Sequence, residues 1–329
     1  MKLMKILLSA EVCQHLRGKL TSVFADQSFE LLSAETCQLG VDFDCAFVSR
    51  DVTGLSTKFE LEPATQHFYD LLLNAPSLSW VHTHSAGSDR PVFAALLKKN
   101  ILVSTSAGAN AAIVAQSALA GILALARHFP KMAKNQTQRR WRSLIADELP
   151  ADLEGQTALI VGWGSIAQRL ASLLQALGVH CEAIRFNLPM VDTGTARTHH
   201  ISSLKKVLPH ANWLILACPL SAETRGLLNA EVFKLLPAGA HIINVARGEM
   251  IVEADLIAAL QERHLAGAYL DVFAYEPLAL DSPLWNSDNV IVTPHSAGHS
   301  RGNEQRVEDL FFTNLGKRIL QQPLRNLVQ

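Results

Sequence analysis

Three ionisable residues in the second half of the chain offer the side chains that carbonyl reduction requires. Arg247 lies in "INVARGEMI", Glu276 in "YLDVFAYEPL" and His295 in "VIVTPHSAG". An arginine can bind a carboxylate through two hydrogen bonds and polarise an adjacent ketone oxygen. A histidine can donate a proton to the developing alkoxide, and a nearby glutamate can orient that histidine and favour its protonated form. Each residue alone is also compatible with a structural role, so only the joint arrangement indicates catalysis.

A glycine-rich turn offers a place for a dinucleotide that would supply the hydride. The segment "TALIVGWGSIAQRLASLLQALG" reads as a buried strand, a GxGxxA turn and an amphipathic helix. Gly162 allows the tight turn, Gly164 lets backbone N–H groups approach a pyrophosphate, and the small Ala167 allows close packing of helix on strand. The helix N-terminus favours the phosphate charge. A plain strand-to-helix turn is the alternative interpretation.

The end of the next strand bears on which dinucleotide is bound. In "CEAIRFN", Arg185 stands 23 residues after Gly162, where dinucleotide folds usually carry an acidic residue that binds the ribose hydroxyls. An arginine pairs instead with a 2′-phosphate, although a solvent-exposed arginine without this role is the alternative. Glu182, three residues earlier, is expected on the opposite face of the strand. We therefore predict NADPH as the preferred cofactor and NADH as the alternative, with Asn187 as a second donor to the 2′-phosphate and Phe186 beside the adenine.

The elements that must position these residues are strands and helices in alternation. Short apolar runs such as "CAFVSR" and "LSWVHTHS" fill the first hundred residues, and "TALIVG", "NWLILACP", "HIINVARG", "GAYLDVF" and "NVIVTPH" form a second series. Continuous apolar runs are typical of parallel strands buried on both faces. A long apolar helix over 109–128 separates the two series. We predict an α/β protein with two parallel sheets, in which the catalytic candidates follow successive strands.

Composition excludes several other classes of protein. The 329 residues are 49% hydrophobic and 18% charged with a formal net charge of −1, so a nucleic-acid partner is not expected. No apolar run reaches the 18 or so residues of a membrane span, and no membrane association is predicted. The five cysteines form no CxxC pair, and the histidines show no metal-ligand spacing. We therefore expect a cytoplasmic protein with free cysteine thiols and no metal site.

The string of motifs resembles the NAD(P)-dependent D-isomer-specific 2-hydroxyacid dehydrogenase family. The matching segments are "WVHTHSAGSD", "GWGSIAQRLASLLQALG", "ACPLSAETRGLLNAEVFKLLPAGAHIINVARG", "HLAGAYLDVFAYEPL" and "NVIVTPHSAG", in family order between residues 80 and 300. Two positions depart from the commonest family pattern. Ala167 replaces a third glycine, and Arg185 replaces the acidic residue, which puts the choice of NAD in doubt but not dinucleotide binding.

The resemblance implies a role for each matching position. Arg247 binds the substrate carboxylate and carbonyl, His295 is the acid/base, and Glu276 is its partner. Backbone N–H groups of Ser85, Ala86 and Gly87 hold the substrate carboxylate. The implied cofactor contacts are Gly162, Gly164, Ser165, Ile166, Arg185, Cys218, Pro219, Val245, Ala246, Asp271 and His295.

The resemblance also implies a domain arrangement and an assembly. Two flavodoxin/Rossmann-like domains are expected, with the cofactor domain (104–298) inserted into a substrate domain made of 1–103 and 299–329. Family members are usually homodimers, so we expect a homodimer. The helix over 109–128 and the following segment to Trp141 are candidate contacts. For Trp141 the resemblance implies a side chain that reaches toward a neighbouring active site, and the alternative is a surface residue that shields apolar side chains.

The sequence as a whole favours a cytoplasmic reductase of small 2-oxo acids. Glyoxylate or hydroxypyruvate would be reduced to the D-2-hydroxy acid by hydride transfer from NADPH, with His295 as proton donor. One alternative is an NAD(P)H-sensing binding module of the corepressor type on the same fold, because fold alone does not fix function. Another is an enzyme that resembles phosphoglycerate dehydrogenase. Turnover of a 2-oxo acid separates the enzyme from the sensor.

Overall fold

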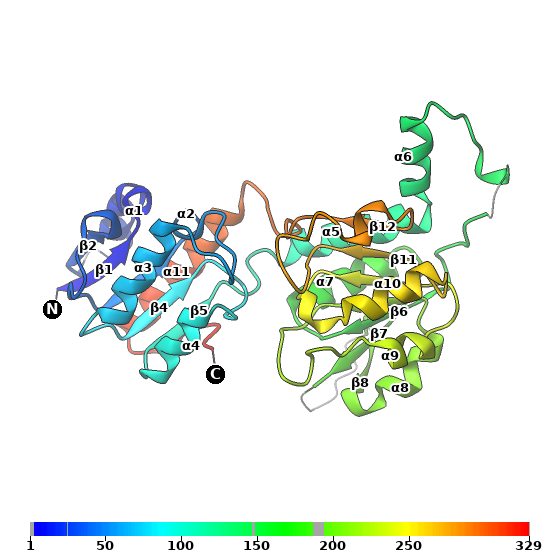
Figure 1. The fold of residues 1–329 in the computed structure, drawn as a ribbon. Coiled ribbons are helices and arrows are strands. Elements are labelled where there is room, and N and C mark those ends of the chain that lie inside the picture. Colours follow the sequence, from blue (N-terminus) through cyan, green and yellow to red (C-terminus); the bar gives the residue numbers. More distant parts are fainter. Residues whose placement is uncertain (1–2, 25, 147–148, 187–193, 329) are drawn as a thin grey trace. The chain divides into compact units, whose positions relative to one another are not determined.

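The chain folds into two compact units (Figure 1). The structure, a computed structural model, describes residues 3–24, 26–146, 149–186 and 194–328. Unit 1 contains residues 1–110 and 300–329, and unit 2 contains residues 111–299. The division thus falls a few residues later along the chain than the expected 103/104 and 298/299. The assignment of the units as substrate and cofactor domains stays a prediction.

Unit 1 is a five-stranded parallel sheet between helices. Its strand order is β2-β1-β3-β4-β5, which is the doubly wound order of flavodoxin-like folds. The strands are β1 (Met4–Leu8), β2 (Phe29–Ser33), β3 (Cys45–Val48), β4 (Trp80–Thr83) and β5 (Leu102–Thr105). The helices are α1 (Ala10–Val23), α2 (Arg50–Thr53), α3 (Pro63–Asn74), α4 (Pro91–Lys98) and α11 (Asn303–Ile319), with a 3-10 turn at η1 (Ala34–Thr36).

Both faces of this sheet are covered by apolar helix faces. On one face, α3 and α4 contribute Phe68, Leu72, Phe93 and Leu96 to a cluster with Val81 and Val103. On the other face, α1 and α11 pack over Trp80 and Phe47. The ring of Phe311 in α11 stacks on Phe47 at 4.7 Å and on Trp80 at 5.7 Å between centroids. The last helix of the chain is therefore part of the core of unit 1.

Unit 2 is a seven-stranded parallel sheet in the order β12-β11-β10-β9-β6-β7-β8. Counted from β6, the first six strands follow the Rossmann order. The strands are β6 (Thr157–Val161), β7 (His180–Arg185), β8 (Arg197–His200), β9 (Trp213–Leu216), β10 (Ala240–Asn244), β11 (Leu265–Leu270) and β12 (Val290–Val292). The helices are α5 (Ala111–Ala126), α6 (Phe129–Thr137), α7 (Ser165–Gln175), α8 (Leu204–Val207), α9 (Ala230–Leu235) and α10 (Glu253–Gln261). Short 3-10 turns lie at η2 (Leu144–Ala146), η3 (Ile201–Ser203), η4 (Leu208–His210), η5 (Gly248–Met250) and η6 (Pro283–Asn286).

The long apolar helix predicted over 109–128 is α5, which packs with α7 on one face of the unit 2 sheet. A Cβ atom on its Gly121 would collide with the ring of Tyr269 in β11, so glycine lets the helix approach the sheet closely. Helices α9 and α10 cover the opposite face. Among the described residues, no single helix has the length and apolar character to cross a membrane, and α5 with α6 reaches that length only as a pair bent by 70°.

The predicted α/β class with two parallel sheets is confirmed. The elements that were not anticipated include β8 and α6. β8 carries the polar sequence "RTHH", because it is an edge strand with little buried surface. Helix α6 lies in a polar stretch for which no helix was predicted, and none of its residues is buried.

Candidate functional site

The glycine turn after β6 lies at the point in the sheet where the strand order reverses. β6 is flanked by β7 on one side and by β9 on the other. Gly162 has φ +103°, and a Cβ atom there would lie 2.7 Å from Ala217 O and 2.7 Å from the Cβ of Cys218, which follow β9. Glycine is required both by this backbone conformation and by the close approach of the β9 loop. Ligands of open α/β sheets bind at such reversal points.

The start of α7 matches what a pyrophosphate needs. Gly164 is the N-cap residue and has no side chain to cap the helix, and a Cβ placed on it would meet no atom within 4 Å. The first backbone bond of the helix runs from Gln168 N to Gly164 O. The N–H groups of Ser165 and Ile166 have no acceptor within the described residues. This arrangement of open space and unsatisfied donors at a helix N-terminus fits a bound phosphate group.

Arg185 is the last residue of β7 and is half-buried. It pairs in register with His200 of β8, so both side chains belong to the same face at the edge of the sheet. Glu182 is engaged elsewhere, because its Oε2 lies 2.9 Å from His199 Nε2. Phe186 is described and half-buried, whereas Asn187 lies outside the described residues. A cationic group therefore stands where the acidic residue of NAD-binding folds is usually found.

The loop after β9 contributes Cys218 and Pro219. The Cys218 side chain is buried against the glycine turn, and burial raises the pKa of its thiol to about 12. The thiol is therefore protonated at neutral pH. Pro219 is exposed, and its carbonyl accepts a hydrogen bond from Thr224 Oγ1 at 3.1 Å. The geometry suits a packing contact with a ligand and not a reactive cysteine.

The loop after β10 carries Val245, Ala246 and Arg247 and is fixed by a residue that sequence reasoning missed. Asn244 is fully buried, and its side chain accepts from Ala246 N at 3.0 Å and donates to Arg247 O at 3.0 Å. Arg247 donates from Nη1 to Ala246 O at 2.7 Å. Gly248 lies against the backbone of Phe273. A Cβ atom on Gly248 would overlap the carbonyl group of Phe273. This close approach brings the loops after β10 and β11 together.

Glu276 and His295 are in direct contact. Glu276 Oε2 lies 2.8 Å from His295 Nδ1, and Glu276 Oε1 accepts from Phe273 N at 3.1 Å. The imidazole side chain is 51% exposed, so Nε2 can reach a ligand while Nδ1 is held by the carboxylate. An imidazole held in this way by a carboxylate is suited to proton transfer.

Asp271, the residue after β11, organises the loop that carries His295. Its carboxylate is buried and accepts from Thr293 Oγ1 at 2.6 Å, Ser296 N at 2.8 Å and Ala297 N at 3.0 Å. Its carbonyl accepts from His295 N at 2.8 Å. These bonds hold His295 at φ +48°, in the left-handed region that few residues other than glycine adopt. Asp271 thus positions His295, a role that the sequence did not predict.

The three predicted substrate-binding residues Ser85, Ala86 and Gly87 follow β4 in unit 1. Ser85 Oγ donates to Gly87 O at 2.9 Å and lies 3.0 Å from Thr83 Oγ1. No acceptor contacts the N–H groups of Ala86 and Gly87 within the part of the chain that the structure describes. Two adjacent unsatisfied donors can bind a carboxylate.

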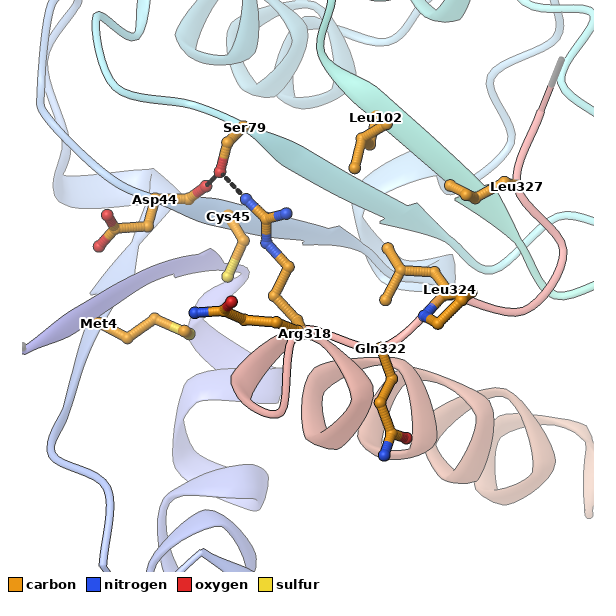
Figure 2. A pocket seen from close by; sticks show the side chains of 11 residues that line it. Met4, Asp44, Cys45, Ser79, Leu102, Arg318, Gln322, Leu324 and Leu327 are labelled. Atoms are coloured by element: carbon orange, nitrogen blue, oxygen red, sulfur yellow. Dashed lines mark hydrogen bonds between the residues drawn. The ribbon is translucent and has the colours of Figure 1, made fainter.

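Unit 1 also contains a cavity of about 540 Å³ with Arg318 at its wall. Figure 2 shows Arg318 beside Ser79, to whose Oγ it donates at 2.6 Å. The cavity is lined by Met4, Cys45 and Leu102, the first residues of β1, β3 and β5. It therefore lies at the amino ends of the strands, opposite the edge that carries Ser85 to Gly87, and is not part of the candidate site.

In unit 2 all predicted site residues gather at the carboxyl edge of one sheet. Arg247, Glu276 and His295 follow the neighbouring strands β10, β11 and β12, and the glycine turn follows β6. Sequence reasoning missed Asn244 and Thr293, which hold the loops, and Gly248, which joins them. Their signal in the sequence was their place within two residues of predicted ones in "INVARG" and "VTPH".

Comparisons with known proteins agree with this geometry. Residues 119–297 match the model of the D-isomer specific 2-hydroxyacid dehydrogenase NAD-binding domain. The chain is 32% identical over 254 residues to an (S)-sulfolactate dehydrogenase of Chromohalobacter salexigens. The aligned residues make up 76% of this chain and 80% of that protein. The chain is also 34% identical over 242 residues to a glyoxylate/hydroxypyruvate reductase of Escherichia coli. This alignment includes 70% of this chain and 72% of the reductase.

A solved structure supports the same conclusion over the whole length. The D-isomer specific 2-hydroxyacid dehydrogenase of Xanthobacter autotrophicus, in complex with NADPH and MES, superimposes with a TM-score of 0.78 at 26% identity, covering 99% of this chain and 98% of that one. The glycine turn and the open helix N-terminus fit the nicotinamide cofactor that this family uses. The chain belongs to the D-isomer specific 2-hydroxyacid dehydrogenase family and is a nicotinamide-dependent oxidoreductase.

Proposed function

We propose that the protein reduces a small 2-oxo acid of the glyoxylate or hydroxypyruvate type to its D-2-hydroxy acid, with NADPH as the hydride donor. The observation that carries this proposal is the 2.8 Å contact between Glu276 and His295. They lie in the loops that follow β11 and β12, on the same sheet edge as the Arg247 loop that follows β10. This set supplies a carboxylate-binding cation and an oriented proton donor at one sheet edge. Relatives named glyoxylate/hydroxypyruvate reductases support the substrate class.

Two groups of residues hold the substrate. Arg247 binds the carboxylate and polarises the adjacent ketone oxygen, because its guanidinium is planar and always charged. The N–H groups of Ala86 and Gly87, in the loop held by Ser85, bind the carboxylate. These contacts fix the carbonyl carbon for attack.

His295 supplies the proton. Glu276 Oε2 accepts from Nδ1, so protonated His295 presents Nε2–H to the ketone oxygen. The negative charge that develops on that oxygen is stabilised by Arg247 and removed by the proton from Nε2. Bound NADPH supplies the hydride. In the reverse direction His295 accepts the proton as a base.

Different residues are assigned to different parts of the cofactor. We assign the pyrophosphate to the turn of Gly162 and Gly164 and to the N–H groups of Ser165 and Ile166. Val245, Ala246 and Asp271 border the nicotinamide, and Cys218 and Pro219 border the adenosine side. Arg185, with His200 beside it on β8, binds the 2′-phosphate and favours NADPH over NADH. The Xanthobacter neighbour, crystallised with NADPH, supports this preference.

We further propose a homodimer in the cytoplasm. The segment from α6 onward exposes large apolar side chains, with Trp141 102%, Ile145 84% and Phe129 56% exposed. Such side chains in succession favour a protein partner, here a second copy. All five cysteines are free, which fits a reducing compartment.

A panel of 2-oxo acids against both cofactors tests the proposal. We expect oxidation of NADPH with glyoxylate or hydroxypyruvate, and a higher kcat/KM with NADPH than with NADH. Pyruvate, longer 2-oxo acids, 3-phosphohydroxypyruvate and the 2-oxo acid that corresponds to sulfolactate complete the panel. NADPH binding without turnover of any acid would instead support the sensor, and preference for the phosphorylated acid would support the enzyme that resembles phosphoglycerate dehydrogenase.

A further inference from the structure

A fully buried polar network runs across the sheet of unit 1 toward the Ser85–Gly87 loop. His82 in β4 and Ser104 in β5 are paired in register, and both are 0% exposed. Ser104 Oγ lies 2.8 Å from His82 Nδ1, and Ser106 Oγ lies 3.1 Å from His82 Nε2. Burying a polar side chain costs free energy unless its polar atoms form hydrogen bonds. The two serine hydroxyls therefore offset the cost of burying the His82 ring.

The donors around Ser104 determine which atom donates in each hydrogen bond of this network. Trp80 Nε1, which can only donate, donates to Ser104 Oγ at 2.9 Å, and Asn314 Nδ2 donates to the same oxygen at 3.4 Å. A hydroxyl has two acceptor positions and one hydrogen, so the hydrogen of Ser104 points to His82 Nδ1. Burial, and to a lesser extent His84, lowers the pKa of His82 to about 3, so the ring is neutral. Its single proton therefore sits on Nε2.

The network ends on the backbone of the loop. His82 Nε2 donates to Ser106 Oγ, and Ser106 Oγ donates to Thr83 O at 3.0 Å. The backbone N–H of Ser106 donates to Ser85 O at 2.9 Å. Ser106 thus donates to the carbonyl groups of Thr83 and Ser85, on both sides of His84. The Ser85 hydroxyl in turn donates to Gly87 O.

We infer that His82 and Ser106 are positioning residues for the 2-oxo acid: neutral His82 orients the Ser106 hydroxyl, and Ser106 clamps Thr83 and Ser85 so that the Ala86 and Gly87 N–H groups stay in place for the substrate carboxylate. This inference rests on the proposed function and extends it to two side chains that do not touch the substrate. It predicts an effect on substrate affinity and not on the chemistry of hydride transfer.

The test compares KM values in substitutions along the network. Ser106→Ala removes both side-chain bonds of Ser106 and should raise KM for the 2-oxo acid on the order of tenfold, because each bond contributes about 1 kcal/mol. The kcat at saturating acid and the KM for NADPH should stay within about twofold of wild type. His82→Phe should act in the same direction. His82→Gln, which keeps an N–H donor toward Ser106, should restore part of the loss.

The matched control is Val81→Ala. Val81 lies on the same strand, is 0% exposed and faces the opposite side of the sheet, in the cluster with Val103. Its truncation should lower the Tm while leaving KM for the acid unchanged. If Val81→Ala raises this KM as much as Ser106→Ala does, the effect is general destabilisation and the inference is wrong. An unchanged KM in folded Ser106→Ala also overturns it.

The outcomes separate this inference from the proposed function. If the wild-type protein reduces none of the acids, the proposed function fails and the inference fails with it. If the wild-type protein turns over and Ser106→Ala has a normal KM, only the inference fails. Should His82→Phe not fold, Ser106→Ala decides the question alone, because it removes one atom and leaves the backbone bond to Ser85 O in place.

Discussion

His295 holds a left-handed backbone conformation that few residues other than glycine adopt, at φ +48°. The cost of such a conformation is on the order of 1–3 kcal/mol, and it persists only where neighbours impose it. Asp271 does so through its carbonyl to His295 N and its carboxylate to Ser296 N and Ala297 N. The same loop brings the imidazole to Glu276. The position of the proposed proton donor thus depends on a buried carboxylate that sequence reasoning had placed at the cofactor.

Arg185→Asp tests the cofactor preference at the scale of one residue. The substitution removes a charged partner of the 2′-phosphate and introduces repulsion, so the ratio of kcat/KM for NADPH to that for NADH should fall on the order of 10- to 100-fold or more. Steady-state kinetics with both cofactors measure it. The control is Arg197→Asp, on the exposed edge strand β8 and in register with Glu182, on the face opposite Arg185, which should leave the ratio nearly unchanged. An unaltered ratio in Arg185→Asp would refute the assignment.

At the scale of elements, the strand-turn-helix unit from β6 to α7 uses its two glycines for different purposes. Gly162 serves the fold, since its φ is +103° and the β9 loop lies against it. Gly164 has φ −84° and open space around it, so nothing in the fold requires glycine there. The pattern GxGxxA predicted both positions, but only the structure separates the structural glycine from the one that a phosphate would need.

Two alanine substitutions test this division. Gly162→Ala should destabilise the protein by roughly 2 kcal/mol or more, because alanine is strained at positive φ and would collide with Ala217 O. Gly164→Ala should leave the Tm unchanged and weaken NADPH binding on the order of tenfold, since its Cβ occupies the path of the pyrophosphate. Thermal unfolding and fluorescence titration with NADPH measure the two effects. Tight NADPH binding by Gly164→Ala would contradict the phosphate assignment.

At the scale of the whole molecule, the sequence predicted the α/β class and the placement of the candidate catalytic residues after successive strands. Buried parallel strands such as β9 and β10 leave a continuous apolar signal, so their place could be predicted. The edge strand β8 and the exposed helix α6 leave none, because most of their side chains need no burial. The supports of the site, Asn244, Gly248 and Ser106, were missed for another reason: their roles depend on contacts between loops that follow different strands.

The measurement that tests the central claim most directly compares the wild-type protein with His295→Ala, using the 2-oxo acid that the wild type reduces fastest. The wild type should oxidise NADPH in the presence of this acid. In His295→Ala, kcat should fall by roughly 10²- to 10⁴-fold, the contribution typical of a general acid, while the Kd for NADPH stays within about twofold. Equal turnover by His295→Ala would contradict the role of His295. A wild-type protein that binds NADPH and reduces no 2-oxo acid would contradict the proposed function itself.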